Sequence, residues 1–259
     1  NASTANFLNM TQSKLNYILH LADTSLILGQ RLGEWCGHGP VLEQDIALTN
    51  ISLDLIGQAR YYYQYAAEIE GGDKTEDTYP FFRTEREFLN LILVEQPNED
   101  WAHTMVRQFF FDNYNQLMLQ QLVNSKDTQI AAIASKALKE AVYHYKFSSE
   151  WMLRMGDGTE ESHARMITAI EDLWDYTGEM FKPAAYETEM AAAGVGVDVA
   201  ALKSDWEART RQVMQEATLG IPERPAFQTG GKTGVHSEYL GRILTDLQYM
   251  QRAYPGLEW

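Results

Sequence analysis

Four acidic residues lie at mirrored positions in two predicted helical hairpins, where carboxylates can bind a pair of metal ions. The hairpins are predicted to turn near residues 38 and 125. Residues equally far from the turn of an antiparallel hairpin lie at the same height along it, so an acid on one helix can face an acid on the other. The candidate residues are Asp23, Asp54, Asp112 and Glu140. We therefore expect these four carboxylates to converge.

The nitrogen ligands of a di-iron site are missing from this pattern. Ferritin-like di-iron proteins place a histidine three residues after a glutamate on two of their four helices. Here the third residue after Asp54 is Gly57, and the third residue after Glu140 is Tyr143. His144 lies one residue further, about 100° around the helix from Tyr143. We interpret His144 as an ordinary hydrogen-bonding neighbour of Glu140.

Carboxylates that are buried together without a metal repel each other, so each needs a proton or a cation. Basic residues occur on the same predicted helices: Arg31, Arg60, Arg107 and Lys136. We therefore predict a vestigial metal site, in which salt bridges and hydrogen bonds replace iron. An all-oxygen site for Mg²⁺ or Mn²⁺ is the alternative for these acids.

Two other pairs have the acid-x-x-His spacing of a metal site, namely Asp100 with His103 and Glu160 with His163. Both pairs fall in the first turn of a predicted helix, where acids interact favourably with the helix dipole. We interpret them as helix starts.

The elements that position these residues are helices, because helical periodicity dominates and strand-like runs are nearly absent. Long helices are predicted at about 12–35, 41–70, 99–124, 127–155, 160–181, 198–219 and 236–253, with Asn98 as the N-cap of the third. A shorter helix is predicted to open with the capping box of Thr84 and Glu87 and to stop at Pro97. Two hairpins joined by one long crossover are typical of a ferritin-like four-helix bundle. We expect an all-α, ferritin-like domain at 12–259 with additional C-terminal helices, preceded by a partly cloning-derived extension at 1–11.

The composition excludes several classes of function. The 259 residues are 45% hydrophobic and carry a formal net charge of −15, which argues against a nucleic-acid partner. No apolar run is long enough to cross a membrane. The single cysteine, Cys36, cannot form an intramolecular disulfide, which is typical of a reducing compartment. We expect a cytoplasmic protein.

A glycine-rich segment and two aromatic runs are candidates for binding or assembly. TGGKTG at 229–234 resembles the end of a phosphate-binding loop, but Ala226 stands where the first glycine should be. We interpret the segment as a flexible turn, whose Lys232 and His236 are weak candidates for contact with an anion or a partner subunit. The tyrosines of 61–65 and the phenylalanines of 109–111 spread around their helices, so some rings are predicted to face outward into a subunit interface.

Four long segments resemble a known family. These are RLGEWCGHGPVLEQDIALTNISLDLIGQAR, LILVEQPN, KEAVYHYKFSSEWMLRMGDGT and TGGKTGVHSEYLG. Together they resemble the C subunits (PaaC) of bacterial phenylacetyl-CoA epoxidases, over a match that runs from about residue 14 to the end. The resemblance implies a ferritin-like fold and a place in a monooxygenase complex for phenylacetate degradation.

The resemblance also implies which parts of the complex do the chemistry. A homologous A subunit is expected to carry di-iron, while a reductase with flavin and an iron-sulfur cluster passes on electrons from NADPH, and a small B subunit helps to join the parts. This chain is expected to hold no cofactor and to support the A subunit. Whether the isolated chain forms a homodimer is left open by the sequence. The alternatives are a self-sufficient di-iron oxygenase and a CoA-ester-binding module.

Overall fold

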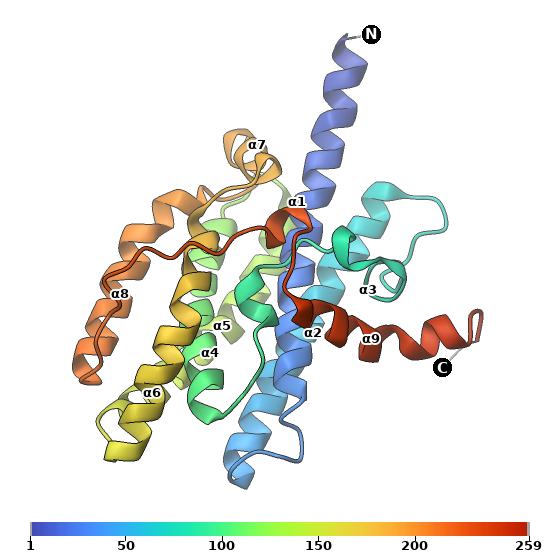
Figure 1. Ribbon diagram of the computed structural model, residues 1–259. Helices are drawn as coiled ribbons and strands as arrows, with labels where there is room; N and C mark the ends of the chain where they lie inside the picture. Colours follow the sequence, from blue (N-terminus) through green and yellow to red (C-terminus); the bar gives the residue numbers. More distant parts are fainter. Residues whose placement is uncertain (1, 258–259) are drawn as a thin grey trace. The chain divides into compact units, whose positions relative to one another are not determined.

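The described chain is built from α-helices and short 3-10 turns (Figure 1). The structure is a computed structural model, and it describes the backbone of residues 2–257 and the side chains of residues 10–257. Within these residues there is no β-strand. In the same part of the chain, no helix is long and apolar enough to span a membrane. The predicted all-α, ferritin-like class is confirmed.

The chain divides into two compact units, each built on one helical hairpin. The first unit comprises the chain up to Leu91, Ala184–Gly196 and the chain from Gly230 onward. The second comprises Ile92–Pro183 and Val197–Thr229. The single domain expected from the sequence stays a prediction, since compact units can belong to one domain or to two.

The hairpin of the first unit pairs α1 (Ala2–Gly33) with α2 (Leu42–Glu70). The two helices approach closely at Gly29, where an added Cβ would lie 2.9 Å from the Ile56 side chain. The Ser52 hydroxyl donates a hydrogen bond to the Gly29 carbonyl at 2.7 Å. The segment predicted as an extension before residue 12 is helical and belongs to α1.

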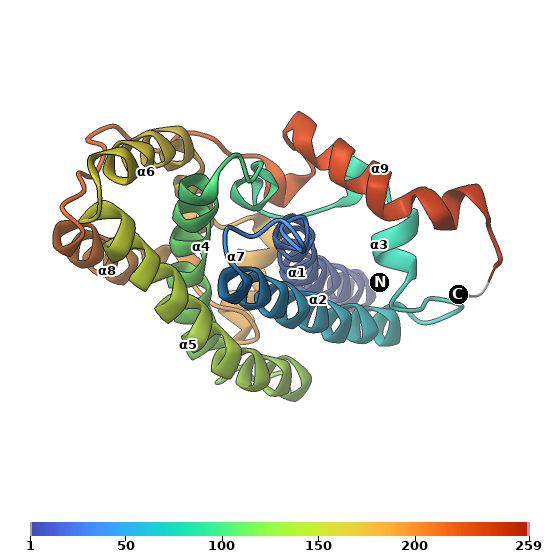
Figure 2. The same cartoon turned by 90° about the horizontal axis from the view of Figure 1, so that it is seen from below.

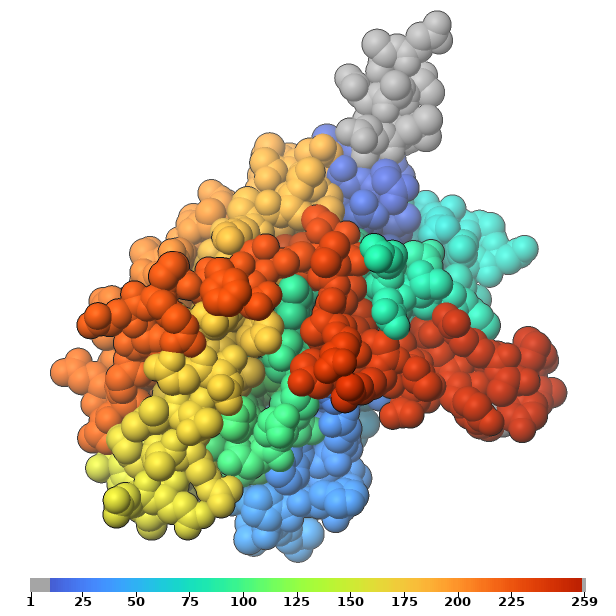
Figure 3. Space-filling model, in the orientation of Figure 1, coloured from blue at the N-terminus to red at the C-terminus, as the bar shows by residue number. Residues whose placement is uncertain are grey.

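Shorter elements cover this hairpin. The helix α7 (Ala185–Ala193) packs on α1, and α9 (Glu238–Ala253) packs mainly on α3 (Thr78–Phe82). In the space-filling view, α9 in red lies against the turquoise segment that contains α3 (Figure 3). Two 3-10 turns complete the unit, η1 (Glu85–Glu87) and η5 (Gly231–Thr233).

The hairpin of the second unit pairs α4 (Trp101–Leu122) with α5 (Thr128–Gly156) (Figure 2). The helix α4 is buried over most of its length, because α5, α6 (Glu160–Leu173) and α8 (Lys203–Glu216) all pack on it. The 3-10 turns η2 (Ile92–Glu95) and η4 (Val199–Leu202) also contact α4, and η3 (Trp174–Phe181) packs between them in this unit.

The predicted helices differ from the structure mainly near their ends. The capping box of Thr84 and Glu87 is present, but it opens a single 3-10 turn instead of a helix that reaches Pro97. The N-cap of α4 is Asp100, because the Asn98 side chain instead accepts a hydrogen bond from Arg107 at 2.7 Å. The helix predicted at 160–181 ends at 173 and continues as η3. The helix α7 is not among the predicted helices.

Candidate functional site

Asp23 lies on α1 in the first unit, and its carboxylate is fully buried against an arginine. The Arg83 guanidinium binds both carboxylate oxygens, with Nη1 3.0 Å from Oδ2 and Nη2 against Oδ1. The Tyr63 hydroxyl donates a hydrogen bond to Oδ1 at 2.6 Å, and the Leu89 N–H donates one to Oδ2 at 2.9 Å. Protein donors therefore occupy both oxygens of Asp23.

The surroundings of Arg83 hold its charge in place. Burial lowers the pKa of the guanidinium, but the charge and hydrogen bonds of Asp23 outweigh this effect and raise the pKa overall. Arg83 Nε also donates to the Tyr79 carbonyl at 2.8 Å. The Phe88 ring lies 4.3 Å from the guanidinium carbon, a distance at which a cation and an aromatic face attract. Arg83 therefore remains a buried cation fixed next to Asp23.

A second buried ion pair lies in the same unit. Lys232 Nζ is 3.0 Å from Glu187 Oε2, and both side chains are almost fully buried. His20 Nδ1 donates to the Leu89 carbonyl at 2.7 Å, and its Nε2 is 3.6 Å from Glu187 Oε1. The two ends of the Leu89 residue thus connect the clusters, because its N–H binds Asp23 and its carbonyl binds His20.

Asp112 lies on α4 in the second unit and is buried with neutral hydrogen-bond donors on both carboxylate oxygens. Its Oδ1 accepts a hydrogen bond from Gln108 at 2.7 Å, and its Oδ2 accepts one from the Ser148 hydroxyl at 2.8 Å. Burial raises the pKa of Asp112 to about 6, against the opposing effects of the nearby His144 charge and the two hydrogen bonds. Asp112 therefore titrates close to neutral pH.

The predicted acids occupy both units. Asp23 and Asp54 belong to the first unit, and Asp112 and Glu140 belong to the second. The apolar neighbours of Asp54 in ISLDLIG and of Asp112 in FFFDNYN predict that both are buried, which is confirmed for Asp112 but not for the half-buried Asp54. Asp23 is buried and Glu140 is half-buried. Asp112 meets His144 and Ser148, which lie one and two turns beyond Glu140 along α5. The hydrogen bond expected between His144 and Glu140 stays a prediction.

The side chains of these clusters do not fit a di-iron centre. Such a centre needs carboxylates and imidazoles whose lone pairs face the metals. A metal at Asp23 would instead meet the positive charge of Arg83, which binds both carboxylate oxygens. Among the described residues, no three His, Cys, Asp or Glu side chains are arranged to hold a metal ion.

The structure corrects the interpretation of the glycine-rich segment. Lys232 is not presented by a flexible loop, because it lies in η5 and is 3% exposed. Its ammonium is bound by Glu187, so it is not available to an anion. His236 Nε2 is 2.7 Å from the Phe88 carbonyl, which fixes this residue within the first unit. Both side chains are therefore bound within the first unit.

The aromatic runs also differ from their prediction in part. Tyr61 faces outward and is 40% exposed, whereas Tyr62 and Tyr63 are buried. All three phenylalanines at 109–111 are buried, because elements of the second unit pack on several sides of α4. The prediction of outward-facing phenylalanines is therefore wrong.

The two helix-start pairs behave as interpreted. The Asp100 carboxylate caps α4 by accepting a hydrogen bond from the His103 N–H at 2.9 Å. Glu160 lies in the first turn of α6, and His163 Nδ1 donates to the Gly156 carbonyl at 2.6 Å. Neither pair contributes to the buried clusters.

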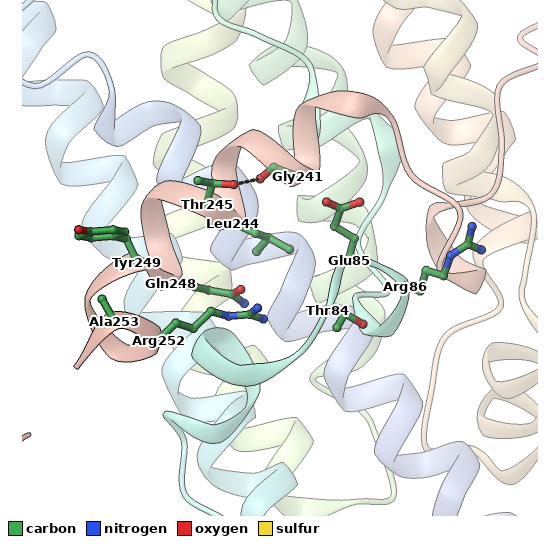
Figure 4. Close-up of a pocket in the computed structure, with 10 residues that line it drawn as sticks. All are labelled: Thr84, Glu85, Arg86, Gly241, Leu244, Thr245, Gln248, Tyr249, Arg252 and Ala253. Atoms are coloured by element: carbon green, nitrogen blue, oxygen red, sulfur yellow. Dashed lines mark hydrogen bonds between the residues drawn. The ribbon is translucent and has the colours of Figure 1, made fainter. Parts of the chain in front are cut away.

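A pocket of about 840 Å³ lies in the first unit, between α9 and the segment after α3 (Figure 4). Gln248 and Arg252 on α9 donate hydrogen bonds to the Arg83 carbonyl at 2.9 and 3.0 Å. Figure 4 shows the side chains of Tyr249 and Arg86 pointing away from Gln248. The polar groups of this pocket therefore hold α9 in place, and they form no constellation of catalytic groups.

Three residues of these clusters are not predicted by the sequence pattern, namely Arg83, His20 and Glu187. The signal for Arg83 is its setting among aromatic residues in YPFFRTEREF, since an arginine that is buried among apolar side chains needs an acidic partner. Glu187 lies on the missed helix α7, so its ion pair with Lys232 had no structural context. Nothing in the spacing of His20 connects it to Leu89.

A comparison with known proteins gives the family. The family model described as "Phenylacetic acid catabolic protein" matches residues 2–259. The chain belongs to this family. Within the phenylacetic acid catabolic proteins, it is 48% identical over 243 residues to the C subunit of the 1,2-phenylacetyl-CoA epoxidase of Escherichia coli (strain K12). That match covers 94% of this chain and 98% of the relative. The resemblance stated from the four sequence segments is confirmed.

Proposed function

We propose that this chain is a noncatalytic structural subunit of a phenylacetyl-CoA 1,2-epoxidase. It would support a homologous catalytic subunit that holds di-iron, while a small B subunit and a reductase with flavin and an iron-sulfur cluster would complete the complex and draw on NADPH. The similarity to the C subunit of an epoxidase supports the complex. The pairing of Asp23 with Arg83 supports the noncatalytic role, because it places an arginine charge where a metal would need a free carboxylate.

The two rival functions have less support. A self-sufficient di-iron oxygenase needs a donor set that Asp23 and Asp112 do not offer, since protein donors occupy all four of their oxygens. A CoA-ester-binding module would depend on Lys232, whose ammonium is buried and bound by Glu187.

Reconstitution tests this proposal. The isolated chain is expected to contain no stoichiometric iron and to consume no O₂ with phenylacetyl-CoA and the reductase. Epoxide is expected to form only after the catalytic subunit is added. Stoichiometric iron, or O₂ consumption by the isolated chain, would contradict the noncatalytic role.

Asp112→Asn gives a matched control, because the asparagine keeps the shape of a buried acid and removes its ability to be a charged metal ligand. Epoxide formation by the complex with this variant is expected to stay within about twofold of the wild type, since no interaction made only in the transition state is lost. A loss of turnover with an intact complex would place the chemistry on this chain.

A further inference from the structure

The outer side of α5 carries basic and aromatic side chains, opposite the side that packs into the second unit. The buried positions recur at helical spacing along α5 and include Ile133, Ala137, Ala141, His144, Ser148 and Met152. The opposite side, which we call the α5 stripe, includes the exposed residues Lys136, Lys139, Val142, Tyr143, Lys146, Glu150 and Arg154, so it carries four basic side chains and one acidic one. Figure 2 shows α5 along its length, at the side of its unit.

The apolar part of the α5 stripe is formed by Val142 and Tyr143, and the Tyr143 ring packs against less exposed rings of the same helix. Val142 and Tyr143 are 49% and 48% exposed. The Tyr143 ring lies 6.1 Å from Phe147, and Phe147 lies 6.4 Å from Trp151, as measured between ring centroids. Tyr143 is thus the exposed end of a packed row of rings. A ring held in this way loses little conformational entropy on binding, which favours aromatic residues as anchors of interfaces.

The charge of the α5 stripe is opposite to that of the chain. The whole protein has 21 basic and 36 acidic residues, whereas α5 has four basic residues and two acidic ones. The side chains of Lys146 and Arg154 are 73% and 63% exposed, and each pairs only loosely with Glu150, at 3.8 and 3.7 Å. Exposed ion pairs of this kind contribute little to stability, so Lys146 and Arg154 can exchange Glu150 for an acidic side chain of a partner. The α5 stripe therefore presents positive charge around Tyr143.

We propose that the α5 stripe is the docking surface for the catalytic subunit, which would present acidic side chains around an apolar pocket for Tyr143. This inference rests on the proposed function, which supplies the partner subunit. Complementary charge accelerates association and selects the partner. A symmetric dimer through this face would place the lysines of one copy against those of the other, which is unfavourable. The net charge of −15 also repels nucleic acids and anionic membranes.

Charge reversal tests the electrostatic part of the proposal. The variant Lys139→Glu with Lys146→Glu is compared with the wild type for binding to the purified catalytic subunit, at low and at high salt. The wild type is expected to bind about tenfold more weakly at the higher salt. The variant is expected to lose about 100-fold in affinity at low salt and most of the salt dependence. The matched control reverses two exposed lysines of the same unit, Lys126→Glu with Lys203→Glu, and is expected to stay within about twofold of the wild type.

Tyr143→Ala tests the apolar part. It is expected to weaken binding by about tenfold at both salt concentrations, as expected for an interface anchor. The control is Tyr249→Ala on α9, where the ring is 61% exposed. Helical circular dichroism and the thermal midpoint of all variants are measured alongside, and Lys139→Ala with Lys146→Ala replaces the reversed variant if that variant does not fold.

The possible results distinguish an error in the docking surface from an error in the proposed function. If the wild type binds the catalytic subunit and both α5 variants bind equally well, the docking surface is wrong and the proposed function stands. If the wild type does not bind at all, the proposed function fails. Sedimentation of the same variants completes the test, because a dimer of this chain that only the α5 variants abolish would assign the surface to a second copy and overturn the proposal.

Discussion

Asp23 and Asp112 are both buried on core helices, one in each unit, yet the protein accommodates their charges in two different ways. Asp23 faces a buried arginine and receives hydrogen bonds from Tyr63 and Leu89. Asp112 has neutral donors on both oxygens, and burial raises its pKa to about 6. Burial alone therefore does not determine how an ionised carboxylate affects the free energy of unfolding. A paired cation such as Arg83 makes its contribution favourable, whereas neutral donors alone leave it unfavourable.

The largest effect is expected from Asp23→Asn, which leaves Arg83 buried without its counter-charge. Breaking a buried ion pair from one side costs about 3–5 kcal/mol. The free energy of unfolding, measured by urea titration at pH 7, is expected to fall by that amount. Glu76→Gln is the control, because Glu76 pairs with the exposed Arg60 at 3.1 Å, and exposed pairs contribute about 0–1 kcal/mol. Equal losses in both variants would show that burial of the pair is unimportant.

In contrast to Asp23→Asn, the substitution Asp112→Asn is expected to raise the free energy of unfolding at pH 7. The asparagine oxygen can still accept from Gln108, and its amide can donate to the Ser148 oxygen. The substitution removes the cost of ionising a buried carboxyl whose pKa is raised from 3.8 to about 6. This difference corresponds to a gain of about 3 kcal/mol at most. A loss of stability at pH 7 would mean that the charge on Asp112 is favourable.

The pH dependence of this gain sharpens the comparison. Below pH 3.8 the carboxyl of Asp112 is protonated in both the folded and the unfolded chain, so ionisation costs nothing. Between pH 3.8 and about 6 the unfolded chain releases its proton first, and wild-type stability falls as the pH rises. Above pH 6 the cost is complete. The difference in unfolding free energy between Asp112→Asn and the wild type should therefore grow from pH 4 to pH 7, and a constant difference would contradict the raised pKa.

The smallest effects are expected from the hydroxyl groups that bind the two acids. Tyr63→Phe removes a donor to an ionised carboxylate, which is worth about 1.5–3 kcal/mol. Ser148→Ala removes a donor to Asp112, which is worth about 1 kcal/mol at pH 5, where that carboxyl is mostly protonated. Urea titrations at pH 5 compare the two directly. A larger loss from Ser148→Ala would mean that Asp112 is ionised at that pH.

The sequence was sufficient for the helical hairpins and for the burial of Asp112, because apolar residues surround this acid at helical spacing. The same reasoning predicts burial for Asp54, which is half-buried, and it does not predict the burial of Asp23. The sequence did not predict the partners of these acids. Arg83 lies in an irregular segment without periodicity, and its contact with Asp23 spans sixty positions in the chain. Long-range contacts of irregular segments depend on packing that a local pattern does not specify.

Two errors have local causes. Glycines usually mark flexible turns, which predicts an exposed loop around Lys232. Here they allow a tight 3-10 turn that places the Lys232 ammonium against Glu187. Asn98 and Asp100 are both good N-caps, and the choice between them depended on Arg107, which binds Asn98. In both cases a tertiary contact overrode a reasonable local preference.

The hydrogen bonds of Leu89 have a consequence for the dynamics of the segment around it. This residue lies outside any helix, yet its N–H and its carbonyl are both held by side chains of α1. Its amide proton should therefore exchange with deuterium as slowly as those of the surrounding core helices. For the same reason trypsin, which requires an extended and accessible chain, should cut after Arg83 only when the first unit unfolds.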